Sequence, residues 1–292
     1  MRSIRTAFLL ACVAGLAQTP ARGQSGSVTS TRARLDARAI LTKIDSLQAL
    51  VEHESATVEM RLFDGDREVR RRTFDLKTMN VGGIRKTLVV FTSPADIRGV
   101  GLLTIETASQ SASQTATQTA TQGATQGATQ TSTQTSTLTD QRLYLPALHR
   151  IQRITGSRRG ERFAGSDFSY EDLRARDPDE YESSIIEKQR GVWIIAMAPS
   201  DERSPYSRIE ATVDSARLVV TRARYFDRNQ KLKKILTSSS FSESRPGVWK
   251  PETMIMTDVQ ENSRTELHYR DRDTDSTIPP ETFTERQLKR GS

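Results

Sequence analysis

This 292-residue sequence has a single cysteine, Cys12, which lies near the N-terminus. Residues 1–23 place Arg2 and Arg5 before an apolar run over residues 7–17, an arrangement typical of a secretory signal peptide. Cleavage at the end of this segment leaves a mature chain without a thiol, which excludes disulfide bonds, cysteine nucleophiles and thiolate metal sites. A minor alternative is lipid attachment at Cys12, although apolar residues continue beyond it.

Long hydrophobic runs are also missing. The apolar run of the leader has about eleven residues, whereas a membrane-spanning helix needs about 20. No later stretch is long and apolar enough either, so we expect the mature chain to be an exported, soluble protein.

Histidine is scarce, and the three histidines show neither HxxxH nor HExxH spacing: His53, His149 and His268. No GxSxG nucleophile motif occurs. Residues 271–282 place aspartates at calcium-loop positions, but Ser276 stands where glycine is needed and Thr282 where glutamate closes the site. We therefore expect no metal site, no cofactor and no enzymatic activity.

Positive charge is in modest excess. The full chain has a net charge of +7, and loss of residues 1–23 leaves about +4. Basic residues cluster in residues 68–74, 148–162 and 228–236. The first interpretation is solvated strand faces, and the second is attraction to anionic lipid headgroups or to an acidic partner. Candidates for such contacts are Arg150, Arg153, Arg158, Arg159 and Arg162. We expect no nucleic-acid partner, because export removes the chain from that target.

A threonine- and glutamine-rich tract interrupts the chain. Residues 107–139 carry no charge, and residues 109–136 form seven tetrads with glutamine at every fourth position. Such a segment buries too little apolar surface to offset the entropy of ordering it, so we expect a disordered insertion at 107–139. The strands predicted at 99–106 and 141–148 then pair as neighbours, and residues 24–292 form a single domain.

The patterns on either side of residue 55 predict different elements. Residues 34–53 predict a helix, because their apolar side chains recur at helical spacing: Ile40, Ile44, Leu47 and Val51. Asp36 is the expected N-cap. From residue 55 onward the apolar period becomes two, and turn signals separate roughly ten strands. One helix followed by a long antiparallel meander predicts an α+β fold.

The segment 163–173, FAGSDFSYEDL, is unusually rich in aromatic and acidic residues. Ser169 followed by Asp172 resembles a capping box and predicts a short helix from about Tyr170. Its apolar side chains then face the concave side of the sheet and cover it as a lid, and they are Phe163, Phe168, Tyr170 and Leu173.

Several of these stretches resemble one known family. Residues 99–106, 142–157, 163–173 and 278–290 are similar to segments of the LolA-like outer-membrane lipoprotein-sorting proteins. The resemblance implies an unclosed, strongly curved antiparallel β half-barrel with an N-terminal helix and short lid helices, around an apolar cavity that receives acyl chains.

The function implied by this resemblance is that of a monomeric periplasmic carrier, which moves the acyl chains of a lipid or lipoprotein towards the outer membrane. The alternative is a periplasmic lipid-sensing or adaptor module that contacts a membrane transporter. Strands that are apolar on both faces are candidates for the cavity wall. Together with the lid residues above, the candidates are Met60, Leu62, Trp193, Ile195, Met197, Met254 and Met256.

Overall fold

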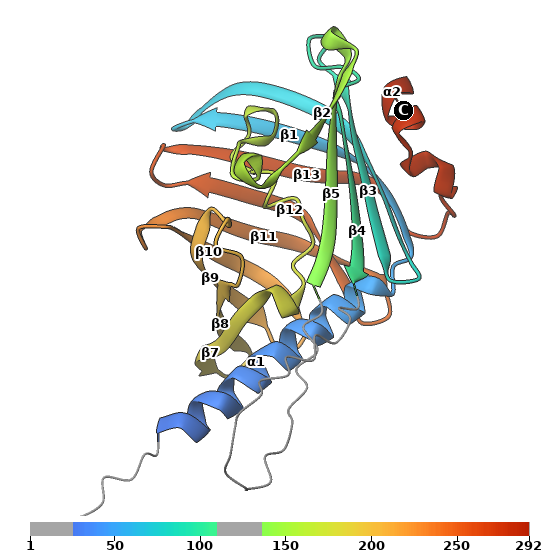
Figure 1. The fold of residues 1–292 in the computed structure, drawn as a ribbon. Coiled ribbons are helices and arrows are strands. Elements are labelled where there is room, and N and C mark those ends of the chain that lie inside the picture. The colour runs from blue at the N-terminus through green and yellow to red at the C-terminus, as the bar shows by residue number, and fades with distance from the viewer. Residues whose placement is uncertain (1–25, 110–135, 292) are drawn as a thin grey trace, which may run out of the picture.

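The computed structural model describes residues 26–109 and 136–291. Its main feature is an antiparallel sheet of 13 strands that curves strongly and does not close (Figure 1). The predicted α+β half-barrel is therefore confirmed, with more strands than the roughly ten predicted. The strands are β1 (His53–Asp64), β2 (Arg67–Val81), β3 (Ile84–Ser93), β4 (Gly101–Ser109), β5 (Ser136–Leu145), β6 (Arg150–Ile154), β7 (Tyr181–Gln189), β8 (Val192–Pro199), β9 (Tyr206–Asp214), β10 (Val219–Asp227), β11 (Leu232–Arg245), β12 (Val248–Asp258) and β13 (Ser263–Asp273).

Helices are few. None of those in the described residues combines the length and apolar character that crossing a membrane would require. The α-helices are α1 (Gly26–Ala49) and α2 (Glu285–Arg290), and the short 3-10 helices are η1 (Pro146–Leu148), η2 (Gly156–Arg158), η3 (Phe163–Gly165), η4 (Pro178–Glu180) and η5 (Pro280–Phe283).

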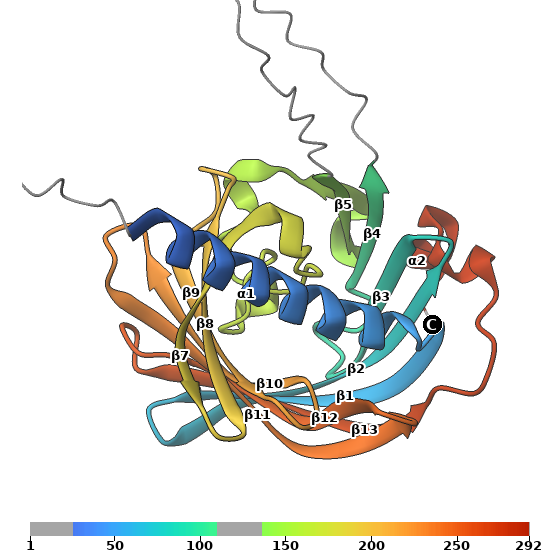
Figure 2. The same ribbon diagram turned by 90° about the horizontal axis from the view of Figure 1, so that it is seen from below.

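The strand order explains how the hollow of the sheet is filled. The order is β6-β5-β4-β3-β2-β1-β13-β12-β11-β10-β9-β8-β7, so β1 and β13 pair in the middle. The two edge strands, β6 and β7, are consecutive in sequence but lie at opposite ends of that order. Residues 155–180 connect them and pass through the inside of the curved sheet (Figures 1 and 2). We call this segment the edge connection.

Strand β1 shows why the sheet has an apolar inner face. Its burial alternates along the strand, and the buried apolar side chains are Ala56, Val58, Met60 and Leu62. Successive side chains of a strand point to opposite faces, so the period-two pattern places these four residues of β1 on the concave side, whereas Phe63 lies on the other face. These four side chains belong to the main hydrophobic cluster.

Helix α1 lies across the open end of the half-barrel (Figure 2). Its partly buried residues Ile40, Leu41 and Ile44 pack against the main cluster. The predicted helix at 34–53 was wrong at both ends. The observed helix begins at Gly26, so Asp36 lies inside it, and it ends at Ala49 because the chain must turn into β1.

The flanks of the threonine- and glutamine-rich tract are strands. β4 pairs with β5 as a direct antiparallel neighbour, from Gly101 opposite Tyr144 to Ser109 opposite Ser136, which confirms the predicted pairing. The expectation of disorder was wrong for residues 107–109 and 136–139, because the β-branched threonines there extend the backbone ladder. The rest of the tract and the predicted signal peptide with Cys12 lie outside the described residues.

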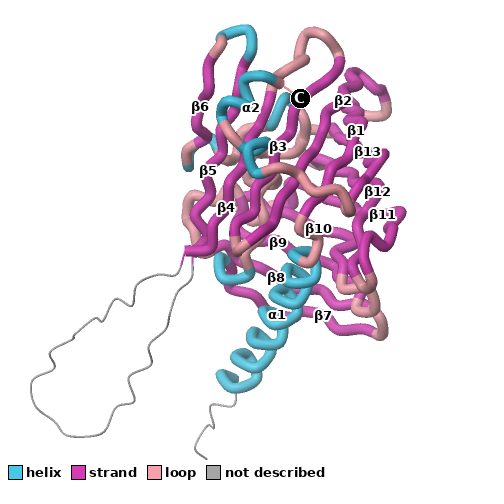
Figure 3. Tube along the Cα trace, turned by 90° about the vertical axis from the view of Figure 1, so that its right-hand side faces the viewer, coloured by secondary structure: helices cyan, strands magenta, loops and turns pink. Residues whose placement is uncertain are grey.

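The C-terminal segment covers the outer face of the sheet beside β3 and β4 (Figure 3). Ile278, Phe283 and Leu288 form a second hydrophobic cluster with outward-facing residues of those strands. Helix α2 approaches β4 so closely that a Cβ at Gly101 would lie 2.6 Å from Leu288 Cδ1. Apolar side chains on both faces of β3 and β4 therefore reflect two packed layers, and not a cavity.

Candidate functional site

The aromatic segment 163–173 contains no α-helix, so the predicted helix from Tyr170 was wrong. Only Phe163–Gly165 is helical, as a single 3-10 turn. The capping-box pair nevertheless forms, since Ser169 N donates to Asp172 Oδ2 at 2.8 Å and Asp172 N donates to Ser169 Oγ at 3.3 Å. The chain forms a turn here in place of a helix, and the Asp172 side chain points into the protein towards Lys234 and Tyr206.

The same segment fills part of the hollow. Phe163, Phe168 and Tyr170 are buried in the main cluster, with the Phe163 ring 5.6 Å from Phe91 and 5.8 Å from Tyr170. Ser263 donates to Asp167 Oδ1 at 2.6 Å, and Thr265 donates to Asp167 Oδ2 at 2.7 Å.

These hydrogen bonds tie the segment to the inner face of β13. The segment therefore plugs one half of the half-barrel, whereas the sequence predicted a lid over it.

A buried charge array joins the end of this segment to the sheet. Asp172 accepts hydrogen bonds from Tyr206 Oη at 2.8 Å and from Lys234 Nζ at 3.1 Å. Burial alone would raise the pKa of Asp172, but the charges of Lys234 and Arg176 and the hydrogen bonds from Ser169 outweigh it, so the pKa of this carboxyl is lowered. Asp172 is therefore ionised inside the protein.

Arg176 continues this array along the edge connection. Its Nη2 donates to Tyr225 Oη at 2.9 Å, and the Tyr225 ring lies 5.0 Å from that of Tyr206. Burial raises the pKa of Tyr225 to about 12, so its phenol is neutral at pH 7. Arginine keeps its charge in proteins, so a guanidinium cation lies beside neutral phenols.

The other half of the half-barrel contains an apolar cavity of about 280 Å³. Leu41 and Ile44 of α1 form one wall, and Pro178 of the edge connection and Tyr181 at the start of β7 form another. The inner faces of β8 to β12 supply the remaining wall, including Met197, Ile209, Tyr225, Trp249 and Met254. The volume is close to the lower limit of about 300 Å³ for small-molecule sites.

The predicted cavity and lid residues divide between this cavity and the packed core. Met197 and Met254 line the cavity. The remaining candidates are buried in the main cluster or packed against it: Met60, Leu62, Phe163, Phe168, Tyr170, Leu173, Trp193, Ile195 and Met256.

Sequence reasoning missed Arg176, Tyr225 and Trp249 as cavity residues. Tyr225 and Trp249 lie on predicted strands, and their aromatic side chains were the available signal.

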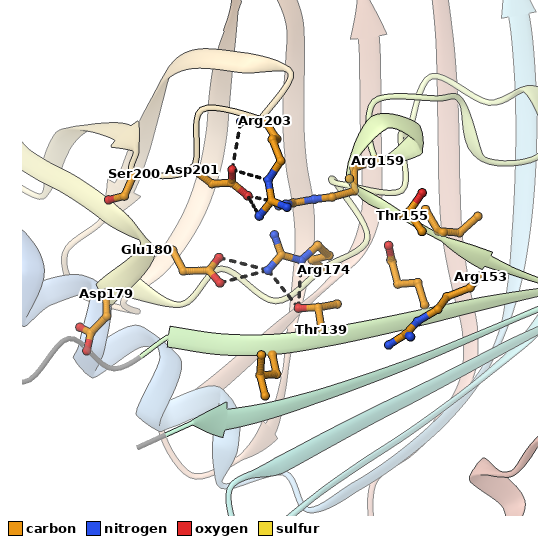
Figure 4. Close-up of a pocket in the computed structure, with 14 residues that line it drawn as sticks. Thr139, Arg153, Thr155, Arg159, Arg174, Asp179, Glu180, Ser200, Asp201 and Arg203 are labelled. Carbon is orange, nitrogen blue, oxygen red and sulfur yellow. Dashed lines mark hydrogen bonds and ion pairs between the residues drawn. The ribbon is translucent and has the colours of Figure 1, made fainter. Parts of the chain in front are cut away.

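A polar pocket of about 700 Å³ lies between the two edges of the sheet (Figure 4). Arg174 of the edge connection donates to Thr139 Oγ1 on β5 at 2.9 Å and pairs with Glu180, just before β7, at 3.1 Å. Arg159 pairs with Glu171 at 2.6 Å and with Asp201 at 2.7 Å. Ion pairs and the hydrogen bond from Arg174 to Thr139 therefore bridge the opening between β6 and β7.

The end of the edge connection and the first residue of β7 separate the two pockets. Arg174 and Glu180 line the polar pocket, whereas Arg176 and Tyr181 line the apolar cavity. Residues 174–181 thus form the wall between the charged opening and the apolar interior.

The predicted headgroup and partner arginines differ in exposure. Arg158 pairs with Glu161, Arg159 is largely buried in the pairs above, and Arg162 lies 3.3 Å from Asp167. Arg153 pairs with Asp140 at 2.7 Å but leaves 70% of its side chain exposed. Arg150 is exposed on edge strand β6.

The comparisons with known proteins agree with this architecture. A family model described as "Uncharacterized protein" matches residues 114–290, which is more than half of the chain. A domain assigned to outer-membrane lipoprotein sorting, from Vibrio parahaemolyticus, is 26% identical with a TM-score of 0.73, covering 88% of this chain and 99% of that one. The chain belongs to the family that this model describes, and its fold is that of the LolA-like lipoprotein-sorting domains.

Two further structures share the LolA-like fold. A DUF1329 family protein from Desulfovibrio piger is 23% identical with a TM-score of 0.71, covering 88% of this chain and 99% of that one. A LolA superfamily protein from Nitrosomonas europaea is 17% identical with a TM-score of 0.59, covering 86% and 98%. The search of curated proteins gave no match.

Proposed function

We propose that this LolA-like protein is a monomeric, non-enzymatic periplasmic carrier that binds the acyl chain of a lipid or lipoprotein and moves it towards the outer membrane. The observation that carries the proposal is the apolar cavity between α1 and the inner faces of β8 to β12. An acyl chain in water costs about 0.8 kcal/mol per exposed CH₂ group, so a carrier must offer apolar surface in exchange. Met197, Trp249 and Met254 provide such surface, and the methionines adapt to chains of different shape.

The size of the cavity is consistent with one chain. At about 280 Å³ it is small among ligand sites, so a long chain requires α1 or the edge connection to move outward. Helix α1 contributes Leu41 and Ile44 to one wall only, so its displacement widens the cavity without disturbing the strand ladder.

The test is lipid analysis of the protein purified from its native compartment. The proposal expects acyl-containing lipid, detected by mass spectrometry after solvent extraction, and saturable binding of a fluorescent fatty acid by the delipidated protein. A protein without lipid that also fails to bind the fluorescent fatty acid contradicts the carrier function. Detection of the mature chain in a periplasmic fraction, cleaved near residue 23, tests the localisation.

A second candidate is a lipid-sensing or adaptor module that contacts a membrane transporter. It is favoured by the exposed Arg150 and Arg153 on edge strand β6, where Lys289 of α2 lies in the same surface pocket. Substituting both arginines by glutamine should abolish capture of such a partner while leaving acyl-chain binding unchanged. Partner capture that survives this substitution contradicts the adaptor hypothesis.

A further inference from the structure

Arg176 supplies the charge on the wall of the apolar cavity. Among the described residues that line the cavity it is the charged one, beside the polar Gln48 and Ser238. Its hydrogen bond to Tyr225 Oη, at 2.9 Å, fixes the guanidinium on the inner face of β10. A guanidinium group carries five N–H donors, so this single contact leaves most of them available.

The anion that acts on Arg176, Asp172, does so from a distance and is shared with Lys234. Asp172 is in direct contact with Lys234, at 3.1 Å, and also accepts from Tyr206 and Ser169. No carboxylate among the side chains that the structure describes lies within ion-pair distance of the Arg176 guanidinium. The buried array therefore holds two cations and one anion, and its excess positive charge faces the cavity.

We infer that Arg176 binds the anionic headgroup of a single-chain amphiphile whose acyl chain occupies the apolar cavity. The favoured headgroup is the carboxylate of a long-chain fatty acid, because the planar guanidinium pairs with a carboxylate through two parallel hydrogen bonds. A phosphate monoester has the same charge complementarity. This inference rests on the proposed acyl-chain binding and adds a headgroup preference to it.

Tyr225 acts as the positioning residue for this contact. Its hydroxyl oxygen accepts from Arg176, so its own proton is free to be donated to an anion bound beside the guanidinium. The remainder of the wall, including Trp249 and Met254, is suited to the hydrocarbon chain and not to charge.

The experiment compares four ligands that share a sixteen-carbon chain: palmitate, hexadecyl phosphate, hexadecanol and hexadecyltrimethylammonium. Each is titrated into the delipidated protein at pH 8.5 below the concentration at which it aggregates, and the change in tryptophan fluorescence, to which Trp249 on the cavity wall contributes, reports binding. We expect the anionic ligands to bind about 10- to 100-fold more tightly than hexadecanol, and the cationic ligand to bind more weakly still. Comparison of palmitate with hexadecyl phosphate distinguishes the two headgroups.

The matched variants are Arg176→Met, which removes the charge from the wall, and Arg70→Met, which removes an exposed charge from β2. Arg176→Met should abolish the difference between palmitate and hexadecanol, and Arg70→Met should preserve it. Equal binding of palmitate and hexadecanol by the wild-type protein overturns the headgroup inference but leaves the carrier function intact. If none of the four ligands binds, the carrier function itself fails. The comparison of palmitate with hexadecanol uses the wild-type protein alone. It therefore still tests the headgroup inference if the Arg176→Met chain does not fold.

Discussion

Lys234 Nζ lies 3.1 Å from Asp172 Oδ2, with 3% of the lysine side chain and 1% of the aspartate side chain exposed. Lys234 belongs to β11 and Asp172 to the edge connection, so this ion pair fixes the connection to the sheet beside the cavity. Removal of one partner from a buried pair leaves an uncompensated charge, which costs about 3–5 kcal/mol. The position of the edge connection therefore depends on this contact.

The first prediction concerns the stability that this pair provides. Lys234→Met should lower the free energy of unfolding by about 3 kcal/mol, measured by chemical denaturation. The double variant Asp172→Asn/Lys234→Met should lose less than the sum of the two single variants, because no charge then remains unpaired. The control is Arg67→Met, whose partner Asp64 is 70% exposed, and its cost should be below about 1 kcal/mol. Additive single-variant effects would contradict the pairing.

The second prediction is an acid dependence of stability. The folded pKa of Asp172 is below its unfolded value, since Lys234 and Arg176 outweigh the effect of burial. Its contribution to stability is therefore present above the unfolded pKa of about 3.9 and is lost as the pH falls through the folded value. The free energy of unfolding should decrease below about pH 4, and less steeply in Asp172→Asn. Parallel pH profiles for the two proteins would exclude Asp172 as a source of the dependence.

The third prediction has the opposite sign and concerns Glu106. Burial raises the pKa of this carboxyl, although Ala175 N donates to its Oε1 at 2.8 Å. A raised folded pKa means that stability is lost as the pH rises through the interval between the unfolded and folded values. Glu106→Gln keeps an acceptor for Ala175 and carries no charge. It should be more stable than the wild-type protein at pH 7, and the difference should shrink towards pH 4 in denaturation experiments at both pH values.

The antiparallel meander could be predicted from the sequence because its signals are local, whereas its curvature into an open half-barrel was implied only by the family resemblance. The alternation in β1 decides which side chains face inward, and the turn residues separate the strands. The plug could not be predicted in this way. Ser169 and Asp172 make the contacts of a capping box, but Lys234, 62 positions away in sequence, decides where the aspartate points.

The boundary between core and cavity is likewise a tertiary property. Met254 and Met256 are two residues apart on one face of β12, yet Met254 lines the cavity and Met256 is fully buried in the core. Which inner-face residue meets empty space depends on the path of the edge connection, and no periodicity within β12 encodes that path.

The fourth prediction concerns a substitution that fills the cavity from the sheet side. Ser238 of β11 lines the cavity, whereas its neighbour Ser239 is exposed on the opposite face. Ser238→Phe should fill part of the roughly 280 Å³ and weaken palmitate binding by at least about tenfold without lowering the free energy of unfolding. Ser239→Phe is the matched control and should bind like the wild-type protein. Unchanged binding by Ser238→Phe would place the acyl chain elsewhere.

The last prediction concerns the ion pairs across the opening of the half-barrel. Arg174, with 7% of its side chain exposed, joins Thr139 on β5 to Glu180 before β7, and it forms the wall between the two pockets. If outward movement of residues 174–181 admits the ligand, Arg174→Gln should raise both the association and the dissociation rate of palmitate. The affinity should change less, because the open state exchanges ligand in both directions. Stopped-flow fluorescence measures the rates, and hydrogen exchange should show faster labelling of residues 171–180.

Arg203→Gln is the control for this gate, since Arg203 is 73% exposed and pairs only with Asp201 among the described side chains. Its removal breaks a surface contact of the same pocket without touching β5 or the cavity wall, so palmitate exchange should stay at the wild-type rate. Faster exchange in both variants would show that general loosening of the pocket, and not the Arg174 bridge, controls entry. Unchanged exchange in Arg174→Gln would contradict entry at residues 174–181. The cavity would then open by movement of α1, which forms its opposite wall.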